Sequence, residues 1–387
     1  MNPIPVTAGF MPLLDSVILV TAHEKGFAAR EGLAFELTRE TSWANIRDRV
    51  GVGHFDIAHM LAPMPLASAL GLAPLPARFI APFVLGLGNN AVTVSAALWE
   101  RMAEAGATAN LDAATTGRAL KAVVDRGQNK LRFGVVHHYS AHNYELRYWL
   151  TASGIAPDRD VEIVVLPPPL LPDALGAGAI DGYCVGEPWN SIGVARQNAH
   201  IATVKASIWR SSADKVIGLR QAWADENPQT LLAVLRALHG AALWCSDTAN
   251  HEEAARIVAA PKYLNEEVAI VRRALTGRLA IGAGVERVIP DFYVPYAGAA
   301  NFPRRRHALW FYSQMVRWGD VNHSAANAAL AAASFRPDLY RAALEPLGVM
   351  LPDPDAMPGG PSDEFFDGEA FDPKELEAYM ARQQRIE

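Results

Sequence analysis

Three histidines lie close together near the middle of the sequence, at positions 137, 138 and 142. His138 and His142 are four residues apart, a spacing that aligns two imidazoles on one face of a helix and that occurs in metal sites. The pattern offers no clear third ligand, and His138 is expected to precede the helix that contains His142. We therefore favour a different role for His142, as a hydrogen-bond donor near the start of that helix.

Two potential donors follow a serine at an expected helix N-terminus. Trp43 comes directly after Ser42, and His142 lies two residues after Ser140. The first N–H groups of a helix have no intrahelical acceptor, so such ends attract anions. The helix dipole would lower the pKa of His142 and leave its ring neutral with one donor. A tryptophan considered alone belongs in the core, but the two helix ends together indicate a small anion held between two parts of the chain.

Other polar residues have plainer explanations. Glu187 precedes Pro188 and is expected to cap a helix, because a carboxylate beside an anion would repel it. The run Arg304-Arg305-Arg306-His307 could contact nucleic acid, but in a chain with a net negative charge we favour a solvated helix face. Lys215 considered alone would be an exposed lysine before a strand.

The apolar residues alternate between strand and helix periods over the first two hundred positions. Strands are expected at residues 4–8, 34–37, 55–58, 77–84, 131–136, 161–166, 179–184 and 200–204. Helices are expected at residues 14–22, 42–50, 61–70, 113–126, 141–152, 170–174 and 188–197. This alternation predicts an α/β protein whose sheets are mainly parallel and covered by helices on both faces.

The series divides into two α/β lobes between which the chain crosses twice. We expect residues 1–90 and 205–387 to form lobe I and residues 91–204 to form lobe II, with crossings at 84–95 and 205–219. Helices predominate from residue 225 onward, at 228–244, 252–259, 266–275 and 307–316, and an acidic tail rich in proline and glycine follows at 352–373. A ligand would bind in the cleft between the lobes, at the carboxyl ends of strands.

Composition excludes several classes of protein. The 387 residues are 50% hydrophobic and 20% charged with a net charge of −6, so the chain is neither disordered nor strongly attracted to nucleic acid. Cys184 and Cys245 are too few for a disulfide framework or a zinc knuckle. Residues 79–99 are uncharged but broken by proline and glycine, unlike a membrane span. The chain begins Met-Asn-Pro and enters a strand-like run without an export leader, so we expect a soluble cytoplasmic protein.

Several strings resemble the nitrate/bicarbonate-type solute-binding proteins of ABC transporters (NrtA/CmpA-like). They are AHEKGFAAREGL at 22–33, TSWANIRD at 41–48, DIAHMLAPMP at 56–65, HNYELRYWL at 142–150, IVVLPPP at 163–169, YCVGEPWN at 183–190, DKVIGLRQAWADENP at 214–228 and FFDGEAFDP at 365–373. The resemblance covers nearly the whole chain. It implies the type II periplasmic-binding-protein fold, with two α/β lobes, an interlobe ligand cleft and a helical C-terminal extension.

The nitrate-site pattern of that family falls here on Trp43, Asn90, His142, Pro168 and Lys215. Lys215 would supply a counter-charge, and Trp43 an indole N–H together with a ring that covers a flat anion. Asn90 stands where glutamine is expected, so its amide reaches less far, and a bridging water or a tighter cleft is implied. Bicarbonate-binding relatives place an acid at the position of Lys215, so this residue favours nitrate or nitrite.

Exported members of the family carry a leader, and its absence here makes the chain resemble the cytoplasmic nitrate sensors of the NasS type. In these, an RNA-binding antiterminator of the NasT type is held inactive until nitrate or nitrite binds. We therefore expect a sensor whose lobes close on the anion and release this partner, without cofactor, metal, membrane contact or direct contact with nucleic acid. One alternative is the solute-binding component of a nitrate transporter. Another is an enzyme on the same fold, as in thiamin-pyrimidine synthesis, which is disfavoured because no GxSxG, GxxxxGK or DxDxDG motif is present.

Overall fold

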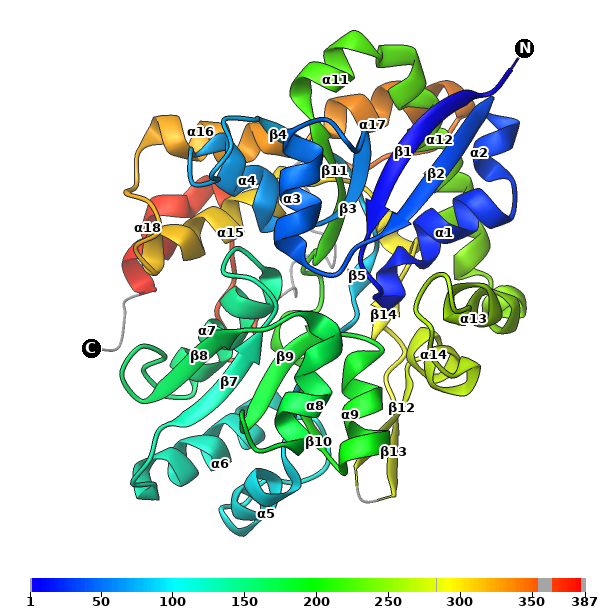
Figure 1. The fold of residues 1–387 in the computed structure, drawn as a ribbon. Helices are drawn as coiled ribbons and strands as arrows, with labels where there is room; N and C mark the ends of the chain where they lie inside the picture. Colours follow the sequence, from blue (N-terminus) through cyan, green and yellow to red (C-terminus); the bar gives the residue numbers. More distant parts are fainter. Residues whose placement is uncertain (1, 283, 354–363, 384–387) are drawn as a thin grey trace.

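The computed structural model describes residues 2–282, 284–353 and 364–383, and its main strands form two five-stranded sheets (Figure 1). We call the parts built around them the first lobe and the second lobe. The first sheet, in the order β2-β1-β3-β11-β4, contains β1 (Ile4–Phe10), β2 (Leu33–Arg39), β3 (Ile57–Leu61), β4 (Phe79–Val84) and β11 (Lys215–Arg220). The second sheet, in the order β10-β6-β9-β7-β8, contains β6 (Asn90–Val94), β7 (Leu131–Val135), β8 (Val161–Val165), β9 (Gly182–Gly186) and β10 (His200–Val204).

Each sheet has one strand that runs against the other four. In the first sheet β1 is parallel to β2 and β3, whereas β11 is antiparallel to β3 and β4. In the second sheet β7 is parallel to β8 and β9, whereas β6 is antiparallel to β9 and β10. Four strands of each sheet therefore point the same way, in agreement with the expected mainly parallel arrangement.

The reversed strand β6 lies within residues 84–95, and β11 overlaps residues 205–219; we expected both segments to be crossings. The chain does pass between the sheets there, but each crossing ends in a strand at the interior of a sheet. All five residues of β6 are buried, as are the first five of β11. A strand buried on both faces has no alternating pattern, so its sequence does not distinguish it from a buried connection.

Helices connect the strands and cover the sheets. Those before β11 are α1 (Val17–Glu24), α2 (Phe27–Arg30), α3 (Trp43–Gly51), α4 (Pro63–Ala69), α5 (Ala96–Glu104), α6 (Ala113–Arg126), α7 (Ala141–Ala152), α8 (Leu171–Gly176), α9 (Trp189–Gln197) and α10 (Lys205–Ile208). The hydroxyl of Ser42 accepts the N–H of Asn45, and the hydroxyl of Ser140 accepts the N–H of Asn143. The helix starts expected at these two serines are thus confirmed, and both are capped by side chains.

The chain after β11 is mainly helical, as expected. Its helices are α11 (Gln221–Glu226), α12 (Pro228–Ser246), α13 (His251–Ala259), α14 (Val268–Leu275), α15 (Arg305–Arg317), α16 (Ala325–Ser334), α17 (Pro337–Leu344) and α18 (Leu376–Arg382). The sequence did not predict the antiparallel pair β12 (Arg278–Gly282) and β13 (Val285–Val288), or the pairing of β14 (Tyr293–Val294) with β5 (Leu87–Gly88). Within the described ranges, no helix combines the length and apolar character that crossing a membrane requires.

The C-terminal segment is anchored by buried aromatic side chains. Phe365 is 3% exposed and stacks on Trp209, with their ring centroids 4.8 Å apart. The hydroxyl of Tyr148, on α7 of the second lobe, donates to the carboxylate of Asp367 at 3.0 Å. Of the acidic tail expected at 352–373, residues 354–363 lie outside the described residues. The described part therefore packs into the protein and connects the C-terminal helices with the second lobe.

Candidate anion-binding site

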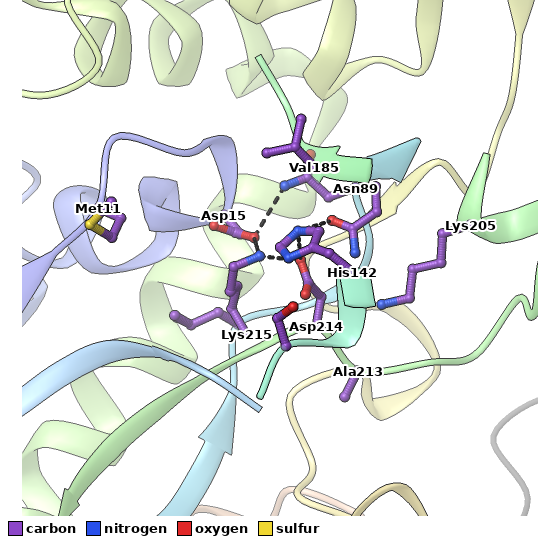
Figure 2. A network of polar contacts seen from close by, with 12 residues as sticks. Met11, Asp15, Asn89, His142, Val185, Lys205, Ala213, Asp214 and Lys215 are labelled. Carbon is purple, nitrogen blue, oxygen red and sulfur yellow. Dashed lines mark hydrogen bonds and ion pairs between the residues drawn. The ribbon is translucent and has the colours of Figure 1, made fainter. Parts of the chain in front are cut away.

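Lys215, the first residue of β11, is buried between two carboxylates (Figure 2). Its ammonium Nζ lies 3.3 Å from Asp15 Oδ2 and forms a second, shorter ion pair with Asp214. Asp15 belongs to the short 3-10 helix η1 (Leu14–Ser16) before α1, so the two acids come from distant parts of the chain. All three residues are at most 2% exposed. The site therefore holds one positive charge against two negative charges.

Burial and charge pairing act on these groups in opposite directions. Burial raises the pKa of both carboxyl groups. At Asp15 the charges of Lys215 and His59 outweigh burial, and at Asp214 those of His142 and Lys215 do so. Both pKa values therefore lie below the ordinary value of an aspartate. Burial likewise lowers the pKa of Lys215, and the two aspartates raise it above its ordinary value. All three groups are consequently ionised at neutral pH.

Trp43 occupies the first position of α3 and is buried against this cluster. Its ring lies 5.6 Å from Lys215 Nζ and packs edge-on against His59, with ring centroids 5.2 Å apart. The indole Nε1 is buried and has no hydrogen-bond partner among the described residues. His59 in turn lies 2.9 Å from Asp15 through Nε2 and accepts the N–H of Met11 at Nδ1. An indole donor therefore faces the interior without an acceptor.

His142 enters from the second lobe, one residue after the start of α7. Its Nε2 lies 3.1 Å from Asn90 Oδ1 and 3.5 Å from Asp214 Oδ2, whereas Nδ1 is buried without a partner in the described part of the chain. Burial lowers the pKa of His142 to about 3, although the charge of Asp214 opposes the shift. The ring is neutral at physiological pH, as expected, but the main cause is burial and not the helix dipole.

A second buried group of polar side chains lies beside the first. Glu145, on α7, receives the hydroxyl of Ser212 at 2.6 Å and lies 3.1 Å from Lys205 Nζ. Asn90, at the start of β6, reaches the same carboxylate with Nδ2 at 3.5 Å. Burial raises the pKa of Glu145, and Lys205 only partly offsets the increase. Asn90 therefore links His142 to a buried ion pair.

A cavity of about 440 Å³ lies between α3 of the first lobe and the segment before α8 of the second. Ser42, which precedes Trp43, lines one side, and Pro167 and Pro169 line the other. Pro168 is buried between these two prolines in the 3-10 helix η2 (Pro168–Leu170), and its ring nitrogen cannot donate a hydrogen bond. The cavity is thus lined by chain neighbours of Trp43 and Pro168, and none of the five predicted residues is among its lining residues.

Four of the five predicted site residues form one connected group. Lys215 contacts the ring of Trp43 and pairs with Asp214, which lies beside His142, and His142 contacts Asn90. No hydrogen bond or ion pair in the described part of the chain joins the side chain of Pro168 to that group. The sequence analysis missed the acids Asp15, Glu145 and Asp214. Asp15 could have been noticed, because a charged residue within the apolar run LLDSVILV must be paired if it is buried.

The other polar motifs have structural roles. No group of metal-binding side chains occurs in the described ranges, and His138 pairs with Asp320 at 2.7 Å. Arg304 and Arg306 are buried and donate to backbone carbonyls, so the arginine run is neither a nucleic-acid patch nor the solvated face that we favoured. Their aliphatic stems are buried with them, and backbone carbonyls accept hydrogen bonds from part of each guanidinium group.

Glu187 has the capping role expected of it. Its carboxylate accepts the N–H of Ser191 at 3.1 Å in the first turn of α9. The side chain is fully buried, and burial raises its pKa to about 7. The glutamate is therefore a structural acid that can exist in its neutral form near physiological pH.

Comparisons with known proteins agree with this architecture. Residues 1–259 match the model of the NMT1-like family. The nitrate/nitrite binding protein NrtA of Synechococcus elongatus is 32% identical over 384 residues, which cover 97% of this chain and 85% of NrtA. The nitrate import ATP-binding protein NrtC of Synechocystis sp. is 33% identical over 99% of this chain, but the chain spans only 55% of NrtC. The crystal structure of the periplasmic nitrate-binding protein NrtA from Synechocystis PCC 6803 is similar with a TM-score of 0.88 and 26% identity, covering 99% of both chains.

The two lobes and their shared buried site define a solute-binding protein with the periplasmic-binding-protein fold. The chain belongs to the NMT1-like family and, among its relatives, to the NrtA/CmpA-like solute-binding proteins. The predicted α/β fold and the family resemblance are thereby confirmed. The enzyme alternative is not supported, because the NrtA relatives that match nearly the whole chain are binding proteins.

Proposed function

We propose that this protein binds nitrate or nitrite in the buried site between its lobes. The supporting observation is that Lys215 lies with two buried nitrogens, Trp43 Nε1 and His142 Nδ1, which have no partner among the described residues. Nitrate is flat and spreads one charge over three weak acceptors, so it is held by several donors more than by a high charge. The names of the NrtA relatives support the same class of ligand.

Replacing Trp43 by phenylalanine tests this proposal. The Trp43→Phe variant keeps a ring against Lys215 but loses the indole N–H, so its nitrate affinity should fall about tenfold or more, the usual effect of losing a hydrogen bond to a charged ligand. Trp244→Phe, on α12 and outside the cluster, is the matched control and should bind like the unmodified protein. Isothermal titration calorimetry measures both, and native affinity in Trp43→Phe would contradict the assignment.

We further propose that the protein is a cytoplasmic sensor that releases an RNA-binding antiterminator of the NasT type when nitrate or nitrite binds. The hydrogen bonds between the lobes include those from Leu14 N–H to Glu187 O at 2.8 Å and from Trp189 Nε1 to Pro12 O at 3.0 Å. Both would break if the lobes separated, so open and closed forms would present different surfaces to a partner. A hundredfold preference of the anion for one form shifts that equilibrium by about 2.7 kcal/mol.

Affinity purification from cells grown with and without nitrate tests the sensor role. An RNA-binding partner should co-purify without nitrate and be released from the purified complex when nitrate is added. Equal amounts of partner at zero and saturating nitrate would contradict the switch.

Delivery of nitrate to a membrane transporter is the second candidate function. It is supported by the similarity to proteins named for nitrate import and for periplasmic nitrate binding. Cell fractionation separates the two proposals, because a solute-binding component that delivers nitrate to an importer must lie outside the cytoplasmic membrane. Recovery of the protein in the cytoplasmic fraction supports the sensor, and recovery in the periplasmic fraction supports transport.

A further inference from the structure

The contacts of His142 determine which ring nitrogen carries the proton. Nε2 lies 3.1 Å from Asn90 Oδ1 and 3.5 Å from Asp214 Oδ2, and both of these oxygens are acceptors. In a neutral imidazole one nitrogen is a donor and the other an acceptor. The proton of the neutral ring therefore lies on Nε2, and the buried Nδ1 presents a lone pair.

Glu145 fixes the orientation of the Asn90 amide on which this argument depends. Asn90 Nδ2 lies 3.5 Å from Glu145 Oε2, so reversing the amide would bring two oxygens together at that distance. The carboxylate is itself held through Oε1, at 3.1 Å from Lys205 Nζ and at 2.6 Å from Ser212 Oγ. Asn90 thus offers a carbonyl oxygen to His142, and the neutral ring has no hydrogen to spare for an anion.

The charges around His142 leave no surplus positive charge for an incoming anion. The charged groups that face the ring are Asp214, Lys215, Lys205 and Asp15, and their formal charges cancel (Figure 2). Glu145, paired with Lys205, makes the buried set as a whole negative. Burying the charge of an anion beside this net negative charge would cost free energy unless a positive charge compensated it. An anion therefore needs a positive charge that the resting cluster does not supply.

We propose that the anion is taken up together with one proton and that this proton binds to Nδ1 of His142. The imidazolium then donates through Nε2 to Asn90 and Asp214 and through Nδ1 to the anion. The proton comes from solvent and adds to a lone pair, so no other bond breaks, and the added charge balances that of the anion. The inference rests on the proposed nitrate site and states that one proton is bound for each anion bound.

The direction of the resulting pH dependence follows from the two states of the ring. Burial lowers the pKa of His142 to about 3 in the protein without a bound anion. A negative charge beside the ring raises this pKa. Between these two pKa values the complex binds one proton more than the free protein. The affinity for nitrate should therefore rise as the pH falls, by up to tenfold for each pH unit in that interval.

Calorimetric titration of the full chain with nitrate tests the inference directly. Measurements in two buffers of different ionisation enthalpy, from about pH 8 to about pH 5.5, give the number of protons taken up for each anion. We expect uptake that approaches one proton at the acidic end. Clear nitrate binding with equal heats in both buffers at every pH would overturn the inference and leave the proposed function standing. Absence of nitrate binding at every pH would overturn both.

Two substitutions of histidine by asparagine test whether the proton taken up with the anion binds to the ring of His142. His142→Asn keeps an amide near the position of Nδ1 but cannot gain a proton, so it should bind nitrate more weakly and without proton uptake. His137→Asn is the matched control, since His137 is a partly buried histidine of the same segment whose pKa burial lowers to about 4. Its Nδ1 accepts the N–H of Tyr139. Unchanged proton uptake in His142→Asn would overturn the inference. Loss of proton uptake in His137→Asn would overturn it as well.

Glu145 is the rival proton acceptor, because burial raises its pKa. Glu145→Gln removes this possibility and retains a side chain that can accept from Ser212. Proton uptake that persists in Glu145→Gln supports His142, and uptake that disappears there assigns the proton to Glu145 and overturns the inference. The measurement on the unmodified protein decides the question even if a variant does not fold.

Discussion

Two lysines are buried at the junction of the lobes, and their surroundings differ. Lys205 has one carboxylate beside it, that of Glu145 at 3.1 Å, and the two form a balanced ion pair. Lys215 lies between Asp15 and Asp214 and next to the ring of Trp43, with an excess of acid around it. The indole and imidazole nitrogens near Lys215 have no partner in the described part of the chain. A buried lysine thus indicates a binding site when acid is in excess around it and nearby polar nitrogens lack partners, and a structural role when its charge is simply matched.

The largest effect is expected from Lys215→Met. Removing this ammonium leaves two buried carboxylates without their counter-charge, so the free energy of unfolding should fall by about 3–5 kcal/mol. Nitrate affinity should fall more than a hundredfold, as measured by calorimetry, while chemical denaturation measures stability. Lys215→Met combined with Asp214→Asn should regain part of the stability but not the affinity. Recovery of nitrate binding in the double variant would show that Lys215 acts only as a structural partner.

Glu187→Gln examines a buried acid that has no cation beside it among the residues that the structure describes. Besides burial, the groups that affect the pKa of Glu187 are the uncharged Ser191 and Asn190. Because folding raises this pKa from 4.5 to about 7, the folded protein binds more protons and loses stability as the pH rises through that interval. The loss amounts to about 3 kcal/mol and should be absent in Glu187→Gln. Parallel pH profiles of unfolding for both proteins would contradict the assignment.

Lys205→Met breaks the balanced pair and should cost less than Lys215→Met. The remaining Glu145 can become protonated, so we expect a loss of about 2 kcal/mol in the free energy of unfolding near neutral pH. Without Lys205 the pKa of Glu145 rises further, so the loss of stability relative to the unmodified protein should grow as the pH rises above the pKa that Glu145 has in the unmodified protein. Nitrate affinity should change by less than about tenfold. Equal losses of affinity in the two lysine variants would remove the distinction between the two clusters.

The smallest effects are expected from the serines that cap α3 and α7. Ser42→Ala and Ser140→Ala should each lower the free energy of unfolding by about 1 kcal/mol. The loss of stability should be larger for Ser140→Ala than for Ser42→Ala. The hydroxyl of Ser140 is buried and also donates to His137 O at 2.7 Å, whereas Ser42 is only partly buried. Thermal unfolding of both variants checks the order, and a larger loss in Ser42→Ala would contradict it.

The sequence predicted those parts of the site that depend on local structure. Ser42 and Ser140 signalled two helix starts, and the structure places Trp43 and His142 there. It did not predict that β6 and β11 are interior strands, because a fully buried strand lacks a period of two. It also did not predict the partners of Lys215. Asp15 is two hundred positions away, and Asp214, although adjacent, gives no local sign of burial.

The sequence by itself determined the α/β alternation, the helix starts and the family, because periodicity, capping and motif order are properties of neighbouring residues. Only the tertiary structure decided which charges meet. The order of the first sheet places β11 beside β3, and packing then brings Asp15 against Lys215. Burial and ion pairing depend on contacts between distant segments, so the protonation of His142 and the charge balance of the site follow from packing and not from residue types.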